Sequence, residues 1–123
     1  MRQIVNAKIE RTTLGYEDHD ILTFYLQLDY GGAGQSFGDF VLDSPVHNAG
    51  RFVGRIGTAF GMEAIHRVLD VVGVRRWEDL PGKYVRADQE HSKVHRIGNI
   101  LTDDWLDLEA LAKEMGRDDD TDG

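Results

Sequence analysis

The chain contains no cysteine and only two prolines among its 123 residues. The absence of cysteine excludes disulfide bonds, thiolate zinc sites, iron–sulfur clusters and cysteine nucleophiles, and it fits a reducing cytoplasm. Apolar runs are short, and none approaches the roughly 18 residues that a membrane-spanning helix needs. The first ten residues, MRQIVNAKIE, lack the apolar segment of a secretory signal. We therefore expect a cytoplasmic protein with no membrane partner.

Basic residues are outnumbered, with 14 Lys and Arg against 22 Asp and Glu, which gives a formal net charge of −8. An acidic surface repels the phosphate backbone at long range, so we expect no partner among extended nucleic acids. Residues 117–123, RDDDTDG, have the composition of a disordered acidic tail. The length and the 41% of hydrophobic residues predict one domain over residues 1–116, with a core of its own.

The first third of the sequence has the alternation of an antiparallel β-meander. The clearest strand is DILTFYLQLDY, in which every second residue is apolar. A weaker strand, QIVNAKIERTTL, precedes it, and a third follows around Phe40 and Leu42. The residues expected on the buried face of the clearest strand are Leu22, Phe24, Leu26, Leu28 and Tyr30.

Four glycines fall within YGGAGQSFG, residues 30–38, between the second and third strands. A dinucleotide-binding loop needs G-x-G-x-x-G between a strand and a helix. Here the third glycine comes one residue late and a strand follows, so no helix N-terminus would face a phosphate. The stretch therefore predicts a hairpin turn with residues at positive φ.

The remainder of the chain predicts two helices and a hairpin. Residues 44–57 are rich in glycine and predict a loop, with a short extended piece at 51–53. The first helix runs from about Thr58 to a stop at Gly73. A hairpin follows over residues 83–101, with its loop at 88–92, and the last helix begins at an N-cap at Asp103 or Asp104. The order βββ–α–ββ–α predicts an α+β fold: a three-stranded antiparallel meander plus a C-terminal hairpin, packed with two helices.

Two stretches carry chemistry that suits an anionic ligand. Arg51 and Arg55 precede the start of the first helix, and they either form an anion site with its N–H groups or pair with carboxylates. The stretch IGNILTDDW combines an amide, carboxylates and an indole, which suit a base or ribose pocket, and Arg86 would add a phosphate contact. Helix capping and core packing are the competing explanations for the same residues.

No catalytic signature is present. The five histidines are explained as polar loop residues, because neither His19 with its acidic neighbours nor His91 with His95 has the spacing of a common metal site. No serine–histidine–aspartate arrangement or nucleophile elbow occurs. We therefore predict no catalytic residue, no metal, no cofactor and no enzymatic activity.

Four segments carry a resemblance to a family of small proteins encoded by phages and prophages. They are LGYEDHDILTFYLQLDYGGAGQSFGDFVLD, GTAFGMEAIHRVLDVVGV, WEDLPGKYVR and IGNILTDDW, and the resemblance spans residues 4–105. The set is also similar to the Thoeris anti-defence proteins, which sequester a cyclic ADP-ribose signal without hydrolysing it. That resemblance implies α+β protomers that form a homodimer or higher homo-oligomer, with pockets between protomers.

The resemblance implies a phage-type counter-defence protein that binds and holds a cyclic nucleotide or cyclic ADP-ribose signal in the host cytoplasm. Arginines would contact phosphates, aromatic rings would stack on the base, and the amide and carboxylate would bind polar groups. One alternative is an acidic inhibitor of a host defence protein, acting as a nucleic-acid mimic or by strand addition. A nucleotide-directed enzyme with Asp103 or His95 as base is the weakest alternative. The predicted ligand-binding residues are Arg55, Phe60, Arg86, Asn99, Asp103 and Trp105.

Overall fold

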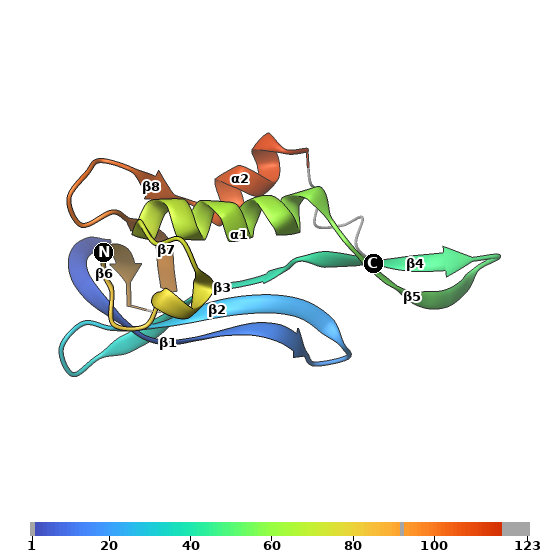
Figure 1. The fold of residues 1–123 in the computed structure, drawn as a ribbon, viewed down its shortest axis with the longest axis horizontal. Coiled ribbons are helices and arrows are strands. Elements are labelled where there is room, and N and C mark those ends of the chain that lie inside the picture. Colours follow the sequence, from blue (N-terminus) through green and yellow to red (C-terminus); the bar gives the residue numbers. More distant parts are fainter. Residues whose placement is uncertain (1, 92, 117–123) are drawn as a thin grey trace.

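The computed structural model describes residues 2–91 and 93–116, which form an α+β fold with a mostly antiparallel sheet and two α-helices (Figure 1). The predicted tail, residues 117–123, lies outside the described residues. In chain order the elements are β1 (Gln3–Glu17), β2 (Ile21–Asp29), β3 (Gly34–Val41), β4 (Asp43–Asn48), β5 (Arg51–Gly57), α1 (Ala59–Val72), the 3-10 turn η1 (Trp77–Asp79), β6 (Tyr84–Glu90), β7 (Lys93–Gly98), β8 (Trp105–Leu106) and α2 (Leu108–Glu114).

Six strands form the main sheet in the order β3-β2-β1-β6-β7-β8. The long strand β1 joins its two halves, because it pairs with β6 through residues 3–8 and with β2 through residues 8–17. The sheet curls until β3 lies beside β7. There the Gln35 side chain donates to the backbone oxygens of Glu90, at 3.3 Å, and His91, at 2.8 Å. The result is a partly open barrel, an arrangement that OB-folds also use.

The core lies between this sheet and α1, which runs along one side of it (Figure 1). The predicted alternation on β2 is confirmed, since Phe24, Leu26 and Leu28 are fully buried. The helix begins after Thr58, whose hydroxyl accepts from the N–H of Gly61 at 2.9 Å. It ends at Gly73, whose φ of 88° is the left-handed conformation predicted there.

The extended piece predicted at residues 51–53 is confirmed as part of β5, but the loop predicted over the rest of residues 44–57 is wrong, because these residues form a second, two-stranded sheet of β4 and β5. We call residues 43–57 the arm; it projects away from the main sheet (Figure 1). Both faces of the arm are largely exposed, so its sequence lacks the polar and apolar alternation that marks a half-buried strand. The predicted three-stranded meander with a single hairpin is therefore too small: the described residues contain eight strands.

The C-terminal region also departs from the prediction in detail. The hairpin of β6 and β7 is present, but β6 continues to Glu90, so Asp88 lies in a strand and not in the loop. Trp105 belongs to β8, which pairs with β7, and the helix begins only at residue 108. Its N-cap is Asp107, so the prediction of Asp103 or Asp104 as the N-cap is wrong.

Candidate functional site

The fold brings four of the six predicted ligand-binding residues together. Arg86 lies on β6, Trp105 lies on β8, and Asn99 and Asp103 lie in the loop between β7 and β8. Arg55 lies on β5, just before α1, whereas the Asn99 amide reaches the last turn of α1 by donating to the Val71 oxygen at 2.9 Å. The 14 residues of α1 separate these two places by about 20 Å.

Arg55 and Phe60 have structural partners of their own. The Arg55 guanidinium pairs with the buried Asp43, with Nη2 and Oδ1 2.9 Å apart, and this carboxylate also accepts from the N–H of Leu22 at 3.2 Å. Phe60 is 3% exposed and its ring lies 6.0 Å from that of Phe40, centroid to centroid. Phe60 is therefore a core residue, and the prediction that it stacks on a ligand does not fit this position.

Hydrogen bonds made by Arg86, which lies outside the loop, and by Asn99, which lies within it, hold the loop from Asn99 to Asp104 in place. Arg86 donates to the backbone oxygens of Asn99, at 2.9 Å, and Thr102, at 2.6 Å. The Asn99 side chain accepts from the N–H groups of Leu101 and Thr102, at 2.8 and 3.0 Å. Asn99 thus serves to hold the loop, while Asp103, whose side chain is 98% exposed, remains open to solvent.

Two guanidinium groups lie over the indole ring of Trp105. The guanidinium carbon of Arg86 lies 4.5 Å from the centroid of the indole ring, and that of Arg96 lies 4.1 Å from it. The opposite residue on β7 is Gly98, where an added Cβ would lie 2.8 Å from the indole Cδ2. The missing side chain at Gly98 therefore leaves the space that the indole occupies against the sheet.

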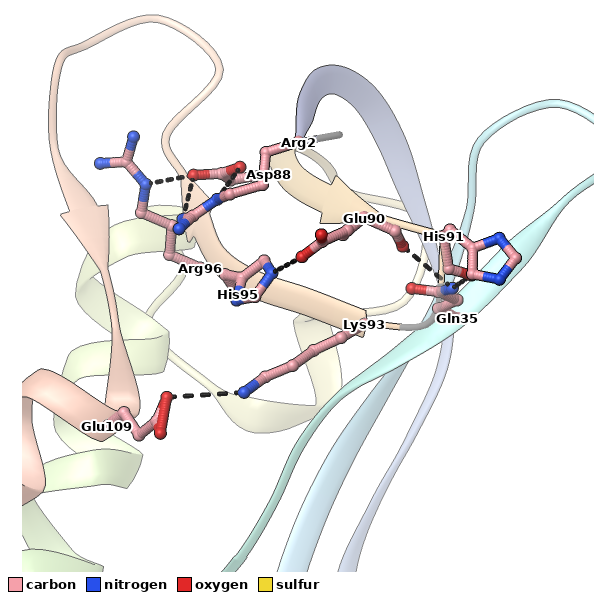
Figure 2. Close-up of polar contacts among 9 residues, drawn as sticks. All are labelled: Arg2, Gln35, Asp88, Glu90, His91, Lys93, His95, Arg96 and Glu109. Atoms are coloured by element: carbon pink, nitrogen blue, oxygen red, sulfur yellow. Dashed lines mark hydrogen bonds and ion pairs between the residues drawn. The ribbon is translucent and has the colours of Figure 1, made fainter.

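A buried carboxylate connects Arg96 to Arg2, near the N-terminus of the chain (Figure 2). Asp88 is 4% exposed and accepts from Arg2 Nη2 and from Arg96 Nε, each at 2.7 Å. The bond from Arg2, opposed by burial and assisted by the bond from Arg96, lowers the pKa of Asp88 to about 2. We call Arg2, Arg86, Asp88, Arg96 and Trp105 the arginine–tryptophan cluster.

The prediction missed Arg2, Asp88 and Arg96. Asp88 and Arg96 could have been found from the sequence, because a shorter hairpin turn places these two residues opposite each other on neighbouring strands. The structure pairs them in this way. Because the prediction placed residues 88–92 in a loop, it gave Asp88 no partner on the opposite strand. The contribution of Arg2 depends on the pairing of β1 with β6, in which the partners lie between 76 (Lys8 and Tyr84) and 86 (Gln3 and Gln89) positions apart in the sequence.

The arginine–tryptophan cluster carries net positive charge on an acidic chain, since it holds three guanidinium groups and one carboxylate. Only Nε of Arg96 faces Asp88, and its two terminal nitrogen atoms point away from that carboxylate (Figure 2). A hollow of about 340 Å³ includes Trp105 in its lining, together with Arg67, Asp70, Val71, Asp104 and Leu106. This volume falls at the lower end of small-molecule sites.

Polar residues beside the cluster form complementary pairs (Figure 2). His95 Nε2 lies 2.7 Å from Glu90 Oε1, and this hydrogen bond lowers the pKa of Glu90. Lys93 lies 3.5 Å from Glu109 of α2. Within residues 2–91 and 93–116, no three His, Asp or Glu residues are grouped so that they would hold a metal ion.

Two other hollows are less suited to a nucleotide. One of about 310 Å³ lies at the root of the arm and includes Arg55, whose guanidinium is already paired with the buried Asp43. A wider one of about 610 Å³ follows α1; its lining holds Arg75, Arg76 and Lys83 beside Glu78 and Asp79, with Arg76 paired to Asp79, and no aromatic residue of the described chain lines it. It lies at the C-terminal end of the helix, where the helix dipole disfavours negative charge.

We found no match to this chain among protein-family models, curated proteins or solved structures. In the part of the chain that the structure describes, no helix is both long and apolar enough to cross a membrane.

Proposed function

We propose that this protein binds a small nucleotide-derived anion at the arginine–tryptophan cluster and holds it without chemical change. The observation that supports this most is the position of Arg96, whose guanidinium lies against Trp105 and directs its terminal nitrogen atoms away from Asp88. Guanidinium groups bind phosphate oxygens through their N–H donors.

The parts of a nucleotide fit different parts of this region. A phosphate would accept hydrogen bonds from Arg96, while the base would enter the 340 Å³ hollow that Trp105 helps to line. Asp70 and Asp104, which line that hollow, would accept hydrogen bonds from ribose hydroxyl or base amino groups. Asp103 is exposed and 3.9 Å from Arg86, so it would compete with an anion only weakly.

An extended single strand of nucleic acid fits this chain less well. OB-folds bind such strands across the face of their second and third strands. Here β2 and β3 contain no Lys or Arg, so that face lacks the cationic groove that binding to the phosphate backbone requires. A small anion that needs only one cationic cluster is the better ligand.

In the biological role that this proposal implies, a phage-type counter-defence protein depletes a cyclic nucleotide or cyclic ADP-ribose immune signal in the host cytoplasm. Sequestration needs no turnover when the protein exceeds the signal. To test it, the purified protein is mixed with a panel of these signals, freed of unbound ligand and heated. Release of an intact signal is expected, whereas release of an altered one would show an enzyme and contradict the proposal.

Arg96→Gln should reduce the affinity for the retained signal about 10- to 100-fold, the equivalent of one lost charge-assisted hydrogen bond. Arg11→Gln removes the same charge from an exposed position on β1 and should leave the affinity unchanged. Thermal melts of both variants separate lost binding from lost folding. Equal affinities for the two variants would exclude the arginine–tryptophan cluster as the site.

The arm favours a second candidate function, inhibition of a host protein by direct contact. Phe52, Val53 and Ile56 are each at least 60% exposed on this projecting ribbon, as interface residues of a free protein are. If no signal is retained and a host defence protein is recovered instead with the purified chain, this second function replaces the first.

A further inference from the structure

We infer that the arm is the contact surface between two copies of this chain. The inference does not depend on the ligand proposed above, since the arm and the arginine–tryptophan cluster lie at opposite ends of α1. It begins from the exposure of the arm: four apolar side chains on its two strands are 37–61% exposed, namely Val46, Phe52, Val53 and Ile56.

The root of the arm is firmly attached, so the exposed side chains are held in place. Asp43 accepts from the N–H of Leu22 and pairs with Arg55 across the two strands. The Leu42 oxygen, at the same root, accepts from both the N–H and the hydroxyl of Thr58, at 3.1 and 2.9 Å. These bonds anchor the ribbon on both sides, to β2 and to the start of α1.

Beyond the root, the ribbon has little to stabilise it within one chain. A two-stranded hairpin is at best marginally stable in water, and each of its edges offers unpaired backbone groups to another strand. The arm is two such strands whose register shifts between Val46 and His47, and no third strand of the described residues pairs with them. Contact with another molecule would bury the exposed apolar side chains of the arm.

Charge indicates that the other molecule is a second copy. The arm holds one acidic and two basic residues, Asp43, Arg51 and Arg55, for a net charge of +1, which leaves −9 on the rest of the chain. The turn between β1 and β2 adds Glu17, Asp18 and Asp20 close to the arm root, all exposed. The exposed Arg51 of one copy therefore finds a complementary acidic surface on another.

The size and shape of this region also suit a two-fold contact. Tyr16 and Phe52 are 71% and 60% exposed, and both line the 310 Å³ hollow between the turn and the arm. In a two-fold arrangement, the arm of each copy would cover the hollow of the other, so the same surface would be used twice. The thirteen strand residues of the arm, with that turn, approach the roughly 20 residues a side of a stable interface.

The test measures self-association of the full chain by sedimentation velocity across a wide concentration range. The wild-type protein should form dimers, and the double variant Phe52→Ser/Ile56→Ser should associate at least tenfold more weakly. The matched control is Ile4→Ser/Tyr84→Ser, which changes two side chains of similar exposure, 53% and 55%, on β1 and β6. Circular dichroism checks that all three proteins are folded.

Because the chain has no cysteine, a crosslink can identify the contact directly. A copy with Val53→Cys and a differently tagged copy with Asp18→Cys should form a mixed disulfide, whereas Tyr84→Cys should not crosslink to the first copy. A monomer at all concentrations, including one that binds a host protein through the arm, would overturn the inference. So would a dimer that Phe52→Ser/Ile56→Ser leaves unchanged.

Discussion

Substitution of Asp88 by asparagine should destabilise the protein in a pH-dependent way. The carboxyl lies 4% exposed between Arg2 and Arg96, and its pKa falls from the ordinary 3.8 to about 2. A change of one in pKa corresponds to about 1.4 kcal/mol, so ionised Asp88 contributes about 2 kcal/mol to folding. Asp88→Asn loses this term and leaves two guanidinium groups without their anion, for a total cost of about 2–3 kcal/mol at pH 7.

The sign of the pH dependence follows from the lowered pKa. A carboxyl whose pKa is depressed in the folded state stabilises the protein fully above the unfolded value near 4, and this stabilisation is lost as the pH falls through about 2. At pH 2.5 about two-thirds of it is gone. The difference in stability between wild type and Asp88→Asn should therefore shrink from about 2–3 kcal/mol at pH 7 to about 1 kcal/mol at pH 2.5.

Urea unfolding followed by tryptophan fluorescence at both pH values measures this difference. Asp70→Asn removes an exposed carboxylate from α1 and serves as the control, with an expected change within about 0.5 kcal/mol at either pH. The reasoning fails if Asp88→Asn unfolds like the wild type at pH 7. It also fails if the gap between the two proteins is as large at pH 2.5 as at pH 7.

Three further substitutions test the packing at the site and at the start of α1. Gly98→Ala places a Cβ against the Trp105 ring and should cost about 1–3 kcal/mol, with a shift of the tryptophan emission. Asn99→Ala removes three hydrogen bonds of the loop and should cost about 1–3 kcal/mol in urea unfolding, with faster amide exchange in the loop as its second readout. Gly61→Ala should lower the melting temperature because the methyl group meets the Leu42 backbone, whereas Gly57→Ala, which meets no atom within 4 Å, should not.

The sequence predicted best those elements whose two faces differ in environment. The sequence of β2 alternates between apolar and polar residues because successive side chains face the core and the outside in turn. Gly73 could be predicted as the end of the helix because a helix stop needs a residue at positive φ. The arm could not be recognised in the same way, because neither of its faces is buried and Pro45 and Gly54 are typical of loops.

The candidate site was only partly predictable, because it depends on strand register. Arg86 and Trp105 were selected for their chemistry, and the fold does place them together. Their neighbour Arg96 could not be selected without the register of β6 and β7, which places Arg96 opposite Asp88. Phe60 was chosen for its ring, although its place on the buried face of α1 makes it part of the core.

The Gln35 contact fixes where this molecule should open first. There, among residues 2–91 and 93–116, the Gln35 amide links the start of β3 to the turn that precedes β7, whereas β1 is held by backbone ladders on both sides. Local opening begins where few bonds must break. In hydrogen exchange, the amides along the junction of β3 and β7 should therefore become labelled long before those in the middle of β1.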